Sequence, residues 1–267
     1  MLIAQITDSH VDAPGALAFG RIDARACLRR ALDAITSLNP RPDLILHTGD
    51  VTQHADLSVN KDVRAMLDET GIRYCAIPGN HDEIEPLRGA FADTTWMPQS
   101  SRFLHYVLED LPVRVICLDT KIPGEVAGEM CAERLQWLSE QLAAGGNKPT
   151  MIAMHHPVFR IGRPISDSRP FRNADAFVEL VSRYPNVSLI VAGHVHCTLQ
   201  TRIAHAVAIA APSTAFQFAM DRRPDSVIAV SGEPPGYYMH DWKDGFGFTS
   251  HYAPIGDFGE LMPLRVS

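Results

Sequence analysis

The sequence predicts an α/β sandwich, because short apolar runs alternate with longer amphipathic segments as far as Ala192. Its 267 residues are 46% hydrophobic and 21% charged, which is enough apolar material for one large core. The same composition excludes an intrinsically disordered chain. The formal net charge of −7 argues against a nucleic-acid polymer as ligand, because binding duplex phosphates requires a basic face.

The predicted strands are compact and apolar, which indicates strands buried on both faces of a sheet. They are Leu2–Thr7, Leu44–His47, Tyr74–Ile77, Val113–Leu118, Met151–Met154 and Leu189–Ala192. The predicted helices between them are Ala24–Leu38, Val59–Thr70, Cys131–Ala143 and Ala174–Arg183. In the first helix Leu28, Leu32 and Ile35 share one face. Gly145 and Gly146 are expected to end the third helix.

After Ala192 the sequence predicts mainly β-structure joined by turns rich in Pro, Gly and Asp. The candidate strands are Gln200–Ile203, Ala206–Ala210, Ser226–Val230, Gly236–Asp241 and Phe246–His251. Asp244 and Gly245 form a hairpin signal between the last two. We therefore expect one α/β domain over residues 1–215. A β-rich extension over residues 216–267 would complete a sheet, form a cap or make oligomer contacts.

The sequence also favours a cytoplasmic protein without a membrane partner. The segment Met1–Thr7 lacks a basic region, and Asp8 interrupts the apolar run, so a secretory signal is not expected. No run reaches the ~18 apolar residues that span a bilayer. The cysteines are odd in number, scattered and without a CxxC pair, which favours free thiols: Cys27, Cys75, Cys117, Cys131 and Cys197. Cys197 adjoins His196 and could be a ligand, although a small buried residue is the favoured interpretation.

Polar residues gather directly after five of the predicted strands. The clusters are Asp8-Ser9-His10, Gly49-Asp50, Gly79-Asn80-His81-Asp82, His155-His156-Pro157 and Gly193-His194-Val195-His196. Open α/β sheets bind ligands at the carboxyl ends of their strands. Each cluster alone has an ordinary explanation, such as a capping Asp or a surface His. Five together are hard to explain without a bound metal.

The possible ligands are two carboxylates, one amide and four imidazoles. They are Asp8, Asp50, Asn80, His10, His155, His194 and His196. Nitrogen and oxygen ligands without a thiolate favour ions such as Zn, Mn, Fe or Co. Seven ligands suffice for two ions if one carboxylate bridges them, so the sequence predicts a two-metal site.

The motifs D-x-H, GD, GNHD, H-x-P and GHxH, in this order, resemble the calcineurin-like metallophosphoesterase superfamily. Within it the chain is similar to class III cyclic-nucleotide phosphodiesterases and, most of all, to bacterial glycerophosphodiesterases. In the latter, segments like Phe19–Asp23 and Arg41–Asp43 occur at similar places. The resemblance covers about residues 1–200. It implies a four-layer α-β-β-α sandwich with two mixed sheets, and a homo-oligomer (dimer or higher) that forms through C-terminal β segments.

The resemblance also implies a role for each ligand. One metal would take Asp8, His10, Asp50 and His196. The other would take Asp50, Asn80, His155 and His194, with Asp50 bridging the two. His81 would be the non-ligand histidine that reaches the phosphate, and His156 would lie just outside the ligand set. The cofactors would be two divalent or mixed-valence ions of Fe, Mn, Zn or Co.

The mechanism implied is hydrolysis of a small phosphodiester by a metal-bound hydroxide that attacks in line with the leaving alkoxide. Asn80 and His81 would stabilise the pentacoordinate state, and His81 would protonate the leaving group. Asp82 would either fix the His81 tautomer or cap the following helix. Glycerophosphodiesters and cyclic nucleotides are the expected substrates. A phosphomonoesterase or nucleotide pyrophosphatase on the same site is the alternative, and an inactive binding module is least favoured because all seven ligands are present.

Two further segments carry open hypotheses about the substrate. The predicted surface loop Arg160–Pro170 contains three arginines, Arg160, Arg163 and Arg169, which could bind a second anionic group or simply be solvated. Phe216, Phe218 and the segment Tyr237–Trp242 could form an aromatic cap, although core or oligomer packing is the favoured interpretation.

Overall fold

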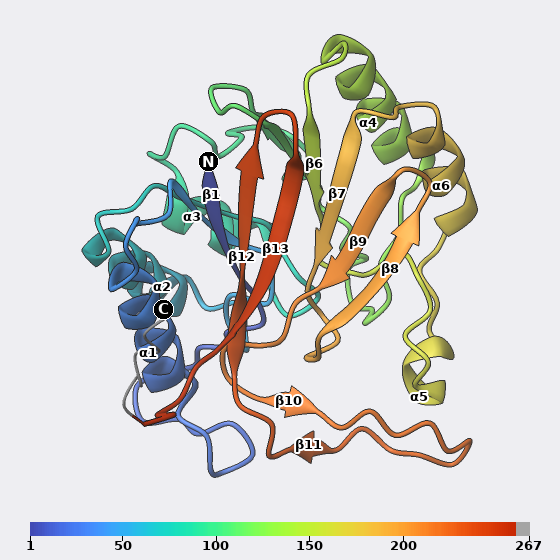
Figure 1. Cartoon of the computed structure of the whole chain (residues 1–267). Coiled ribbons are helices and arrows are strands. Elements are labelled where there is room, and N and C mark those ends of the chain that lie inside the picture. The colour runs from blue at the N-terminus through green and yellow to red at the C-terminus, as the bar shows by residue number, and fades with distance from the viewer. Residues whose placement is uncertain (260–267) are drawn as a thin grey trace, which may run out of the picture.

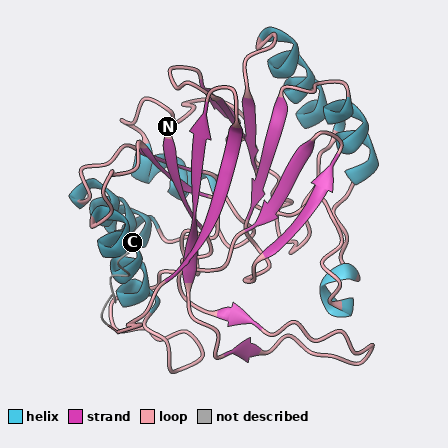
Figure 2. Cartoon of the chain, viewed as in Figure 1, coloured by secondary structure: helices cyan, strands magenta, loops and turns pink. Residues whose placement is uncertain are grey.

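The computed structural model describes residues 1–259 and shows two β-sheets packed between two layers of helices (Figures 1 and 2). The first sheet runs in the order β13 (Gly247–Pro254), β12 (Gly236–Lys243), β1 (Leu2–Ile6), β2 (Leu44–His47) and β3 (Tyr74–Ala76). The second runs β4 (Tyr106–Leu108), β5 (Arg114–Cys117), β6 (Thr150–Ala153), β7 (Val187–Ala192), β9 (Ala206–Ala210) and β8 (Leu199–Ile203). Both sheets mix parallel and antiparallel pairs, so the predicted α/β fold with two mixed sheets is confirmed.

The helices lie on the outer faces of the two sheets. The first sheet is covered by α1 (Ala24–Thr36), α2 (Leu57–Glu69) and α3 (Ile84–Phe91), and the second by α4 (Ala132–Ala144) and α6 (Ala174–Ser182) (Figure 1). Asp23 begins α1 by accepting a hydrogen bond from the Ala26 N–H, as a helix N-cap does. α4 ends at Gly145, as the sequence predicts.

The main core lies between the sheets and extends to the helices of the first sheet. Successive side chains of a strand point to opposite faces, so each central strand contributes to two apolar layers. In β6, Met151 and Ala153 join the core that also contains Ile3 and Leu46 of the first sheet. Ile152, between them, packs instead with the buried residues of α4 and α6. Burial on both faces explains why these strands read as continuous apolar runs.

The C-terminal hairpin is an integral part of the first sheet. β12 pairs with β1 in antiparallel register, and the turn between β12 and β13 contains the predicted Asp244 and Gly245. A buried polar chain joins the hairpin to both sheets. The Gln5 amide donates to the Ala192 carbonyl (2.9 Å), and its oxygen is 3.1 Å from His240 Nε2. Burial lowers the pKa of His240 to about 3, so the ring is neutral and Nε2–H donates to Gln5.

The parallel strands of both sheets run in one direction and end at the same side of the molecule, the lower side in Figure 1. The short helix α5 (Pro164–Asp167) and the two-stranded arm of β10 (Gln217–Phe218) and β11 (Val230–Ser231) lie at this side as well (Figure 1). The polar clusters follow these strand ends, so the topology gathers them in one region.

Several predictions of elements were wrong or incomplete. The strand expected over Ser226–Val230 is absent apart from Val230, because this arm has no core face to bury its apolar residues; Val227 is 68% exposed. β4 was not predicted, α3 was expected only as a helix of unstated length after Asp82, and α5 falls inside the expected loop Arg160–Pro170. Within residues 1–259, no helix is both long and apolar enough to cross a membrane.

Candidate metal centre

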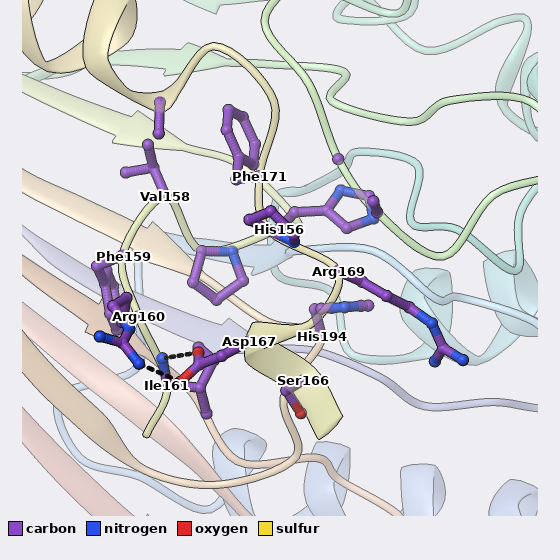
Figure 3. Close-up of a pocket in the computed structure, with 15 residues that line it drawn as sticks. His156, Val158, Phe159, Arg160, Ile161, Ser166, Asp167, Arg169, Phe171 and His194 are labelled. Carbon is purple, nitrogen blue, oxygen red and sulfur yellow. Dashed lines mark hydrogen bonds and ion pairs between the residues drawn. The ribbon is translucent and has the colours of Figure 1, made fainter. Parts of the chain in front are cut away.

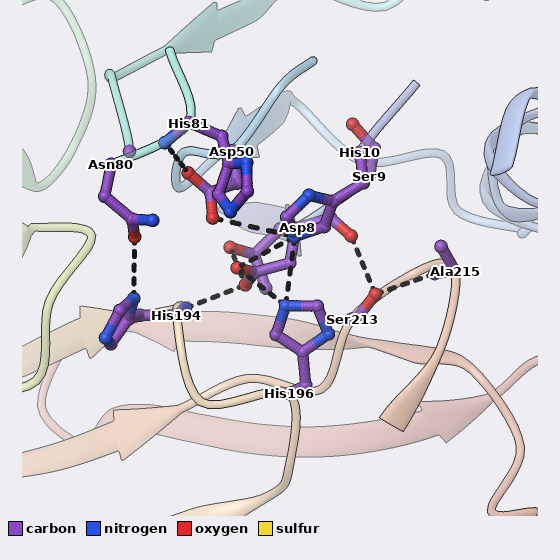
Figure 4. Close-up of polar contacts among 12 residues, drawn as sticks. Asp8, Ser9, His10, Asp50, Asn80, His81, His194, His196, Ser213 and Ala215 are labelled. Atoms are coloured by element: carbon purple, nitrogen blue, oxygen red, sulfur yellow. Dashed lines mark hydrogen bonds and ion pairs between the residues drawn. The ribbon is translucent and has the colours of Figure 1, made fainter. Parts of the chain in front are cut away.

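The structure brings all seven predicted ligands together where the strand ends of the two sheets meet. Figure 4 labels these residues apart from His155. The first sheet supplies Asp8 and His10 after β1, Asp50 after β2 and Asn80 after β3. The second sheet supplies His155 after β6, and His194 and His196 after β7. The site therefore exists only while the two sheets are packed in this arrangement.

Five of the seven residues have the left-handed backbone conformation that residues other than glycine rarely adopt. They are Asp8, His10, Asp50, His194 and His196. Each such residue costs on the order of 1–3 kcal/mol, and such conformations concentrate at functional sites. The surrounding chain fixes them: the Ser213 hydroxyl donates to the Asp8 carbonyl at 2.7 Å, and the His10 N–H donates to the Asp50 carbonyl at 3.0 Å.

Two glycines allow the loops to approach one another closely. A Cβ atom on Gly79 would overlap the Asp50 carboxylate, and one on Gly193 would overlap the side chains of Thr7 and Asp8. Both glycines are needed because backbone packs here directly against a carboxylate, rather than for a turn conformation.

Asp8, His10 and His196 form a first cluster, in which one ring nitrogen of each histidine and one carboxylate oxygen lie close together. His196 Nδ1 donates to the Phe216 carbonyl and His10 Nδ1 to the Gln53 side-chain oxygen, each at 2.8 Å. The Nε2 atoms of the two rings are therefore the ones that face each other, at 3.0 Å. Asp8 Oδ1 lies 3.3 Å from His196 Nε2 and has no hydrogen-bond partner among the described residues. Two imidazole nitrogens close to a buried, unpaired carboxylate oxygen fit a bound cation.

Asn80, His155 and His194 form a second cluster. Asn80 Oδ1 lies 3.2 Å from His155 Nε2 and 2.9 Å from His194 Nδ1. His155 Nδ1 donates to the Thr48 carbonyl at 2.8 Å, so Nε2 is the nitrogen that faces the site. One amide oxygen and two imidazole nitrogens at this spacing also suit a metal ion.

The Asp50 carboxylate lies between the two clusters. Its Oδ2 is 3.6 Å from His10 Nε2 and 3.5 Å from His155 Nε2, while Oδ1 accepts the His81 N–H at 2.8 Å. A single carboxylate that faces ligands of both clusters is suited to bridge two ions.

The charges of the metal-free site compensate one another. Burial alone would raise the pKa of Asp8 and Asp50, but the neighbouring His196 and His155 outweigh burial and lower both pKa values. Burial would likewise lower the pKa of His155, yet Asp50 outweighs it and raises that pKa to about 9. Burial lowers the pKa of His194 to about 3. Without metal, His155 therefore carries the positive charge that pairs with Asp50.

His81 lies beside the first cluster, and Asp82 has neither of the roles expected for it. His81 Nδ1 donates to the Gln53 carbonyl at 3.1 Å, so another group sets its tautomer. α3 is preceded by Glu83 as its cap residue. Asp82 is buried and accepts the N–H groups of Gly79, Val51 and Thr52 at 2.9, 3.0 and 3.1 Å.

These three bonds make Asp82 a positioning residue that ties the Asn80 loop to the loop of Asp50. Burial, reinforced by the Asp50 charge, raises the pKa of Asp82 to about 6 despite the bonds it accepts. Asp82 thus occupies a position where burial and the nearby Asp50 charge disfavour its ionised form.

His156 and one of the loop arginines, Arg163, are both buried. The His156 ring is buried beside His155 and His194, with ring centroids 4.7 Å from each. Its Nδ1 is 2.8 Å from Thr120 Oγ1, and its Nε2 has no partner among the described residues. Arg163 is buried and donates to the Val195 carbonyl at 2.9 Å, so it is not available to bind an anion as suggested from the sequence.

Cys197 is buried, and all five cysteines are free. Within the described residues, the groups of side chains that could hold a metal contain Asp and His and no cysteine. The favoured interpretation of Cys197 as a packing residue thus fits its surroundings.

Sequence reasoning missed the groups that hold the ligands. The Gln53 side-chain oxygen, the Thr48 carbonyl and the Phe216 carbonyl each accept a hydrogen bond from the imidazole of a proposed ligand. Backbone carbonyls carry no sequence signal, so these contacts could not be predicted. A further polar cluster, Asp119-Thr120-Lys121, directly follows β5. It repeats the pattern of the other five clusters and could have been found by the same rule.

Fold and site together define a metal-dependent phosphoesterase, and comparison with known proteins agrees. The chain matches the calcineurin-like phosphoesterase family over residues 1–198 and belongs to that family. It is 32% identical to a probable glycerophosphodiester phosphodiesterase, GpdQ, of Arcobacter nitrofigilis, over 99% of this chain and 97% of the relative. It is 29% identical to the cyclic AMP phosphodiesterase CpdA of Pseudomonas aeruginosa, over 90% of this chain and 86% of the relative.

Solved structures support the fold. A dimetal phosphatase from Danio rerio superposes with a TM-score of 0.66 at 15% identity, covering 96% of this chain and 99% of that one. The family match over residues 1–198 confirms the predicted membership of the calcineurin-like superfamily.

We expect metal binding at the second cluster to release a proton. Because His155 has a pKa of about 9 without metal, its Nε2 is protonated at about pH 7 and must lose that proton to become a ligand. The apparent affinity for Mn²⁺ should therefore rise with pH and level off above about pH 9. Calorimetric titration in buffers of different ionisation enthalpy measures the release directly.

The raised pKa of His155 also determines how the stability of the metal-free protein changes with pH. A raised His pKa contributes stability that is fully present below the unfolded-state value of 6.5 and is lost as the pH rises through about 9. Mn²⁺ binding with no proton release at about pH 7, and with equal affinity at pH 7 and 9, would contradict this electrostatic account.

Proposed function

We propose that the protein holds two divalent or mixed-valence ions of Fe, Mn, Zn or Co and hydrolyses small phosphodiesters. The ligands proposed for one ion are Asp8, His10, Asp50 and His196, and those for the other are Asp50, Asn80, His155 and His194. The position of Asp50, 3.6 Å from His10 Nε2 and 3.5 Å from His155 Nε2, carries the proposal. Bound metal ions would activate a water molecule and neutralise charge on the phosphate.

The residues around the centre supply orientation and proton transfer. The His81 Nδ1–H donates to the Gln53 carbonyl, so Nε2 is the atom left to face a substrate. When protonated, Nε2 can donate to a phosphate oxygen or to the departing alkoxide. Asn80 would offer its side-chain oxygen to the second ion, and Asp82 holds the loop that carries both His81 and Asn80. We assign catalysis to His81 and Asn80, and an indirect role to Asp82.

A cavity beside the second cluster gives room for one arm of a diester. It has a volume of about 150 Å³ and extends from His156 and His194 along the loop before α5 (Figure 3). Its walls include the apolar side chains of Val158, Phe159 and Phe171. Such walls suit an alkyl or aromatic ester group, which is a reason to favour a diester over a phosphomonoester.

The competing activities are phosphomonoester and nucleotide pyrophosphate hydrolysis on the same ions. A substrate panel separates them: bis-p-nitrophenyl phosphate, p-nitrophenyl phosphate, cyclic AMP, a nucleotide pyrophosphate and glycerophosphodiesters, each with the Mn²⁺-loaded enzyme. We expect the highest kcat/KM among the diesters. Preference for the monoester or the pyrophosphate would contradict the proposal, and no turnover of any of them would favour an inactive binding module.

Replacing His81 should separate catalysis from metal binding. His81→Ala removes the imidazole but leaves all seven proposed ligands, so we expect about a 10²–10⁴-fold loss of kcat with metal content unchanged. Metal content is measured by inductively coupled plasma mass spectrometry on the same preparation that is assayed. His54→Ala is the matched control, because His54 is an exposed histidine that is not among the proposed ligands. Loss of metal in His81→Ala would show that this histidine is a ligand or a structural residue.

We propose that the β-rich extension over residues 216–267 completes the first sheet through β12 and β13 and forms a cap and oligomer contact through the β10–β11 arm; residues 260–267 lie outside the described chain. The β10–β11 arm extends from the body and exposes Val227, Ile228 and Val230, which suits contact with a second copy. Sedimentation at micromolar concentration should show a dimer or larger species, and a monomer would contradict this. A cytoplasmic location is also proposed, supported by five free cysteines.

A further inference from the structure

Lys121 is a buried cation beside the metal centre whose role the proposed reaction does not explain. It follows β5 of the second sheet, and its side chain is only 4% exposed. Lysine is almost never this buried unless it is paired, because removing an ammonium group from water is expensive. Its partners therefore indicate what the residue does.

The ammonium group contacts two residues of the first sheet. Nζ donates to Glu83 Oε1 at 3.1 Å and to the main-chain carbonyl of Asn80 at 3.3 Å. The Glu83 side chain is 59% exposed, and ion pairs with so exposed a partner are worth little. The contact with Asn80 is the one that reaches the proposed metal centre.

The second sheet fixes the backbone of Lys121. The Lys121 N–H donates to Asp119 Oδ1 at 2.9 Å, and its carbonyl accepts a hydrogen bond from the guanidinium of Arg134. Asp119 and Arg134 are themselves buried. The ammonium group is thus presented from a rigid support, not from a mobile loop.

The Asn80 loop is held from both sheets. On the side of the first sheet, Asp82 accepts the Gly79 N–H and Asp50 accepts the His81 N–H. On the side of the second sheet, Lys121 binds the carbonyl of Asn80. These contacts fix the peptide from which the Asn80 side chain reaches toward the imidazoles of the second cluster.

We propose that Lys121 is a positioning residue that holds Asn80 in place as a ligand of the second ion. This inference rests on the proposed two-metal function and adds a residue that none of the sequence motifs contains. The second cluster needs such support because its ligands come from both sheets, so its geometry depends on how the Asn80 loop sits against β5 and β6.

Metal binding by Lys121→Met tests the proposal, because methionine keeps most of the side-chain volume and removes the ammonium group. Metal-free protein is titrated with Mn²⁺ by calorimetry, and unfolding temperature is recorded as a check on folding. We expect one of the two ions to bind about 10–100-fold more weakly and the other to be unaffected. Glu83→Gln is the matched control: it removes the ion pair but keeps the Asn80 contact, so both affinities should be unchanged.

The direction of the effect separates positioning from simple electrostatics. Removing a positive charge near a cation site would by itself strengthen metal binding, whereas losing the support of Asn80 weakens it. Lys121→Arg keeps a charged donor and should retain most of the affinity. In an Asn80→Ala background, Lys121→Met should cause no further loss, because the two changes act through the same ligand.

Four results would overturn the proposal: unchanged or stronger Mn²⁺ binding in Lys121→Met, equal weakening of both ions, the same loss in Glu83→Gln, or additive losses with Asn80→Ala. If Lys121→Met does not fold, Lys121→Gln replaces it, with the same expectations. Binding of only one Mn²⁺ by the wild-type protein would instead refute the proposed two-metal function, independently of Lys121.

Discussion

The site depends on one contact between the two sheets. The Asp50 carboxylate follows a strand of the first sheet and faces both His10 of that sheet and His155 of the second sheet. Bringing these three groups together requires the two sheets to pack with their parallel strand ends at one side. The apolar core between the sheets provides that arrangement. The left-handed residues and the two close-approach glycines then place the ligand atoms within a few ångströms of each other.

The electrostatics follow from the same contact. Asp8 and Asp50 are buried carboxylates, and in the metal-free protein the imidazoles of His196 and His155 keep them ionised. Metal ions can take over this role because they displace the proton of His155. Two divalent ions outweigh two carboxylates, so the pocket becomes positive although the whole chain carries −7. An acidic protein can in this way attract an anionic diester.

The sequence predicted the central strands well and also predicted that the proposed ligands lie together, for a common physical reason. Strands buried on both faces, such as Leu44–His47, form uninterrupted apolar runs, and the residues that follow them must lie at one side of the sheet. The arm around Val227 was mispredicted because its apolar residues face solvent rather than a core. The role of Asp82 could not be predicted, since its partners are backbone N–H groups of a distant loop. Lys121 follows the strand-end rule but matches no motif.

The central claim is that Asp50 bridges two metal ions, each of which is held by ligands from both sheets. Anomalous diffraction from crystals of the protein grown with Mn²⁺ tests it most directly. The account predicts two anomalous peaks, one on each side of the Asp50 carboxylate, the first beside His10 and His196 and the second beside His155 and His194. A single peak, or two peaks of which either lies away from Asp50, would contradict it.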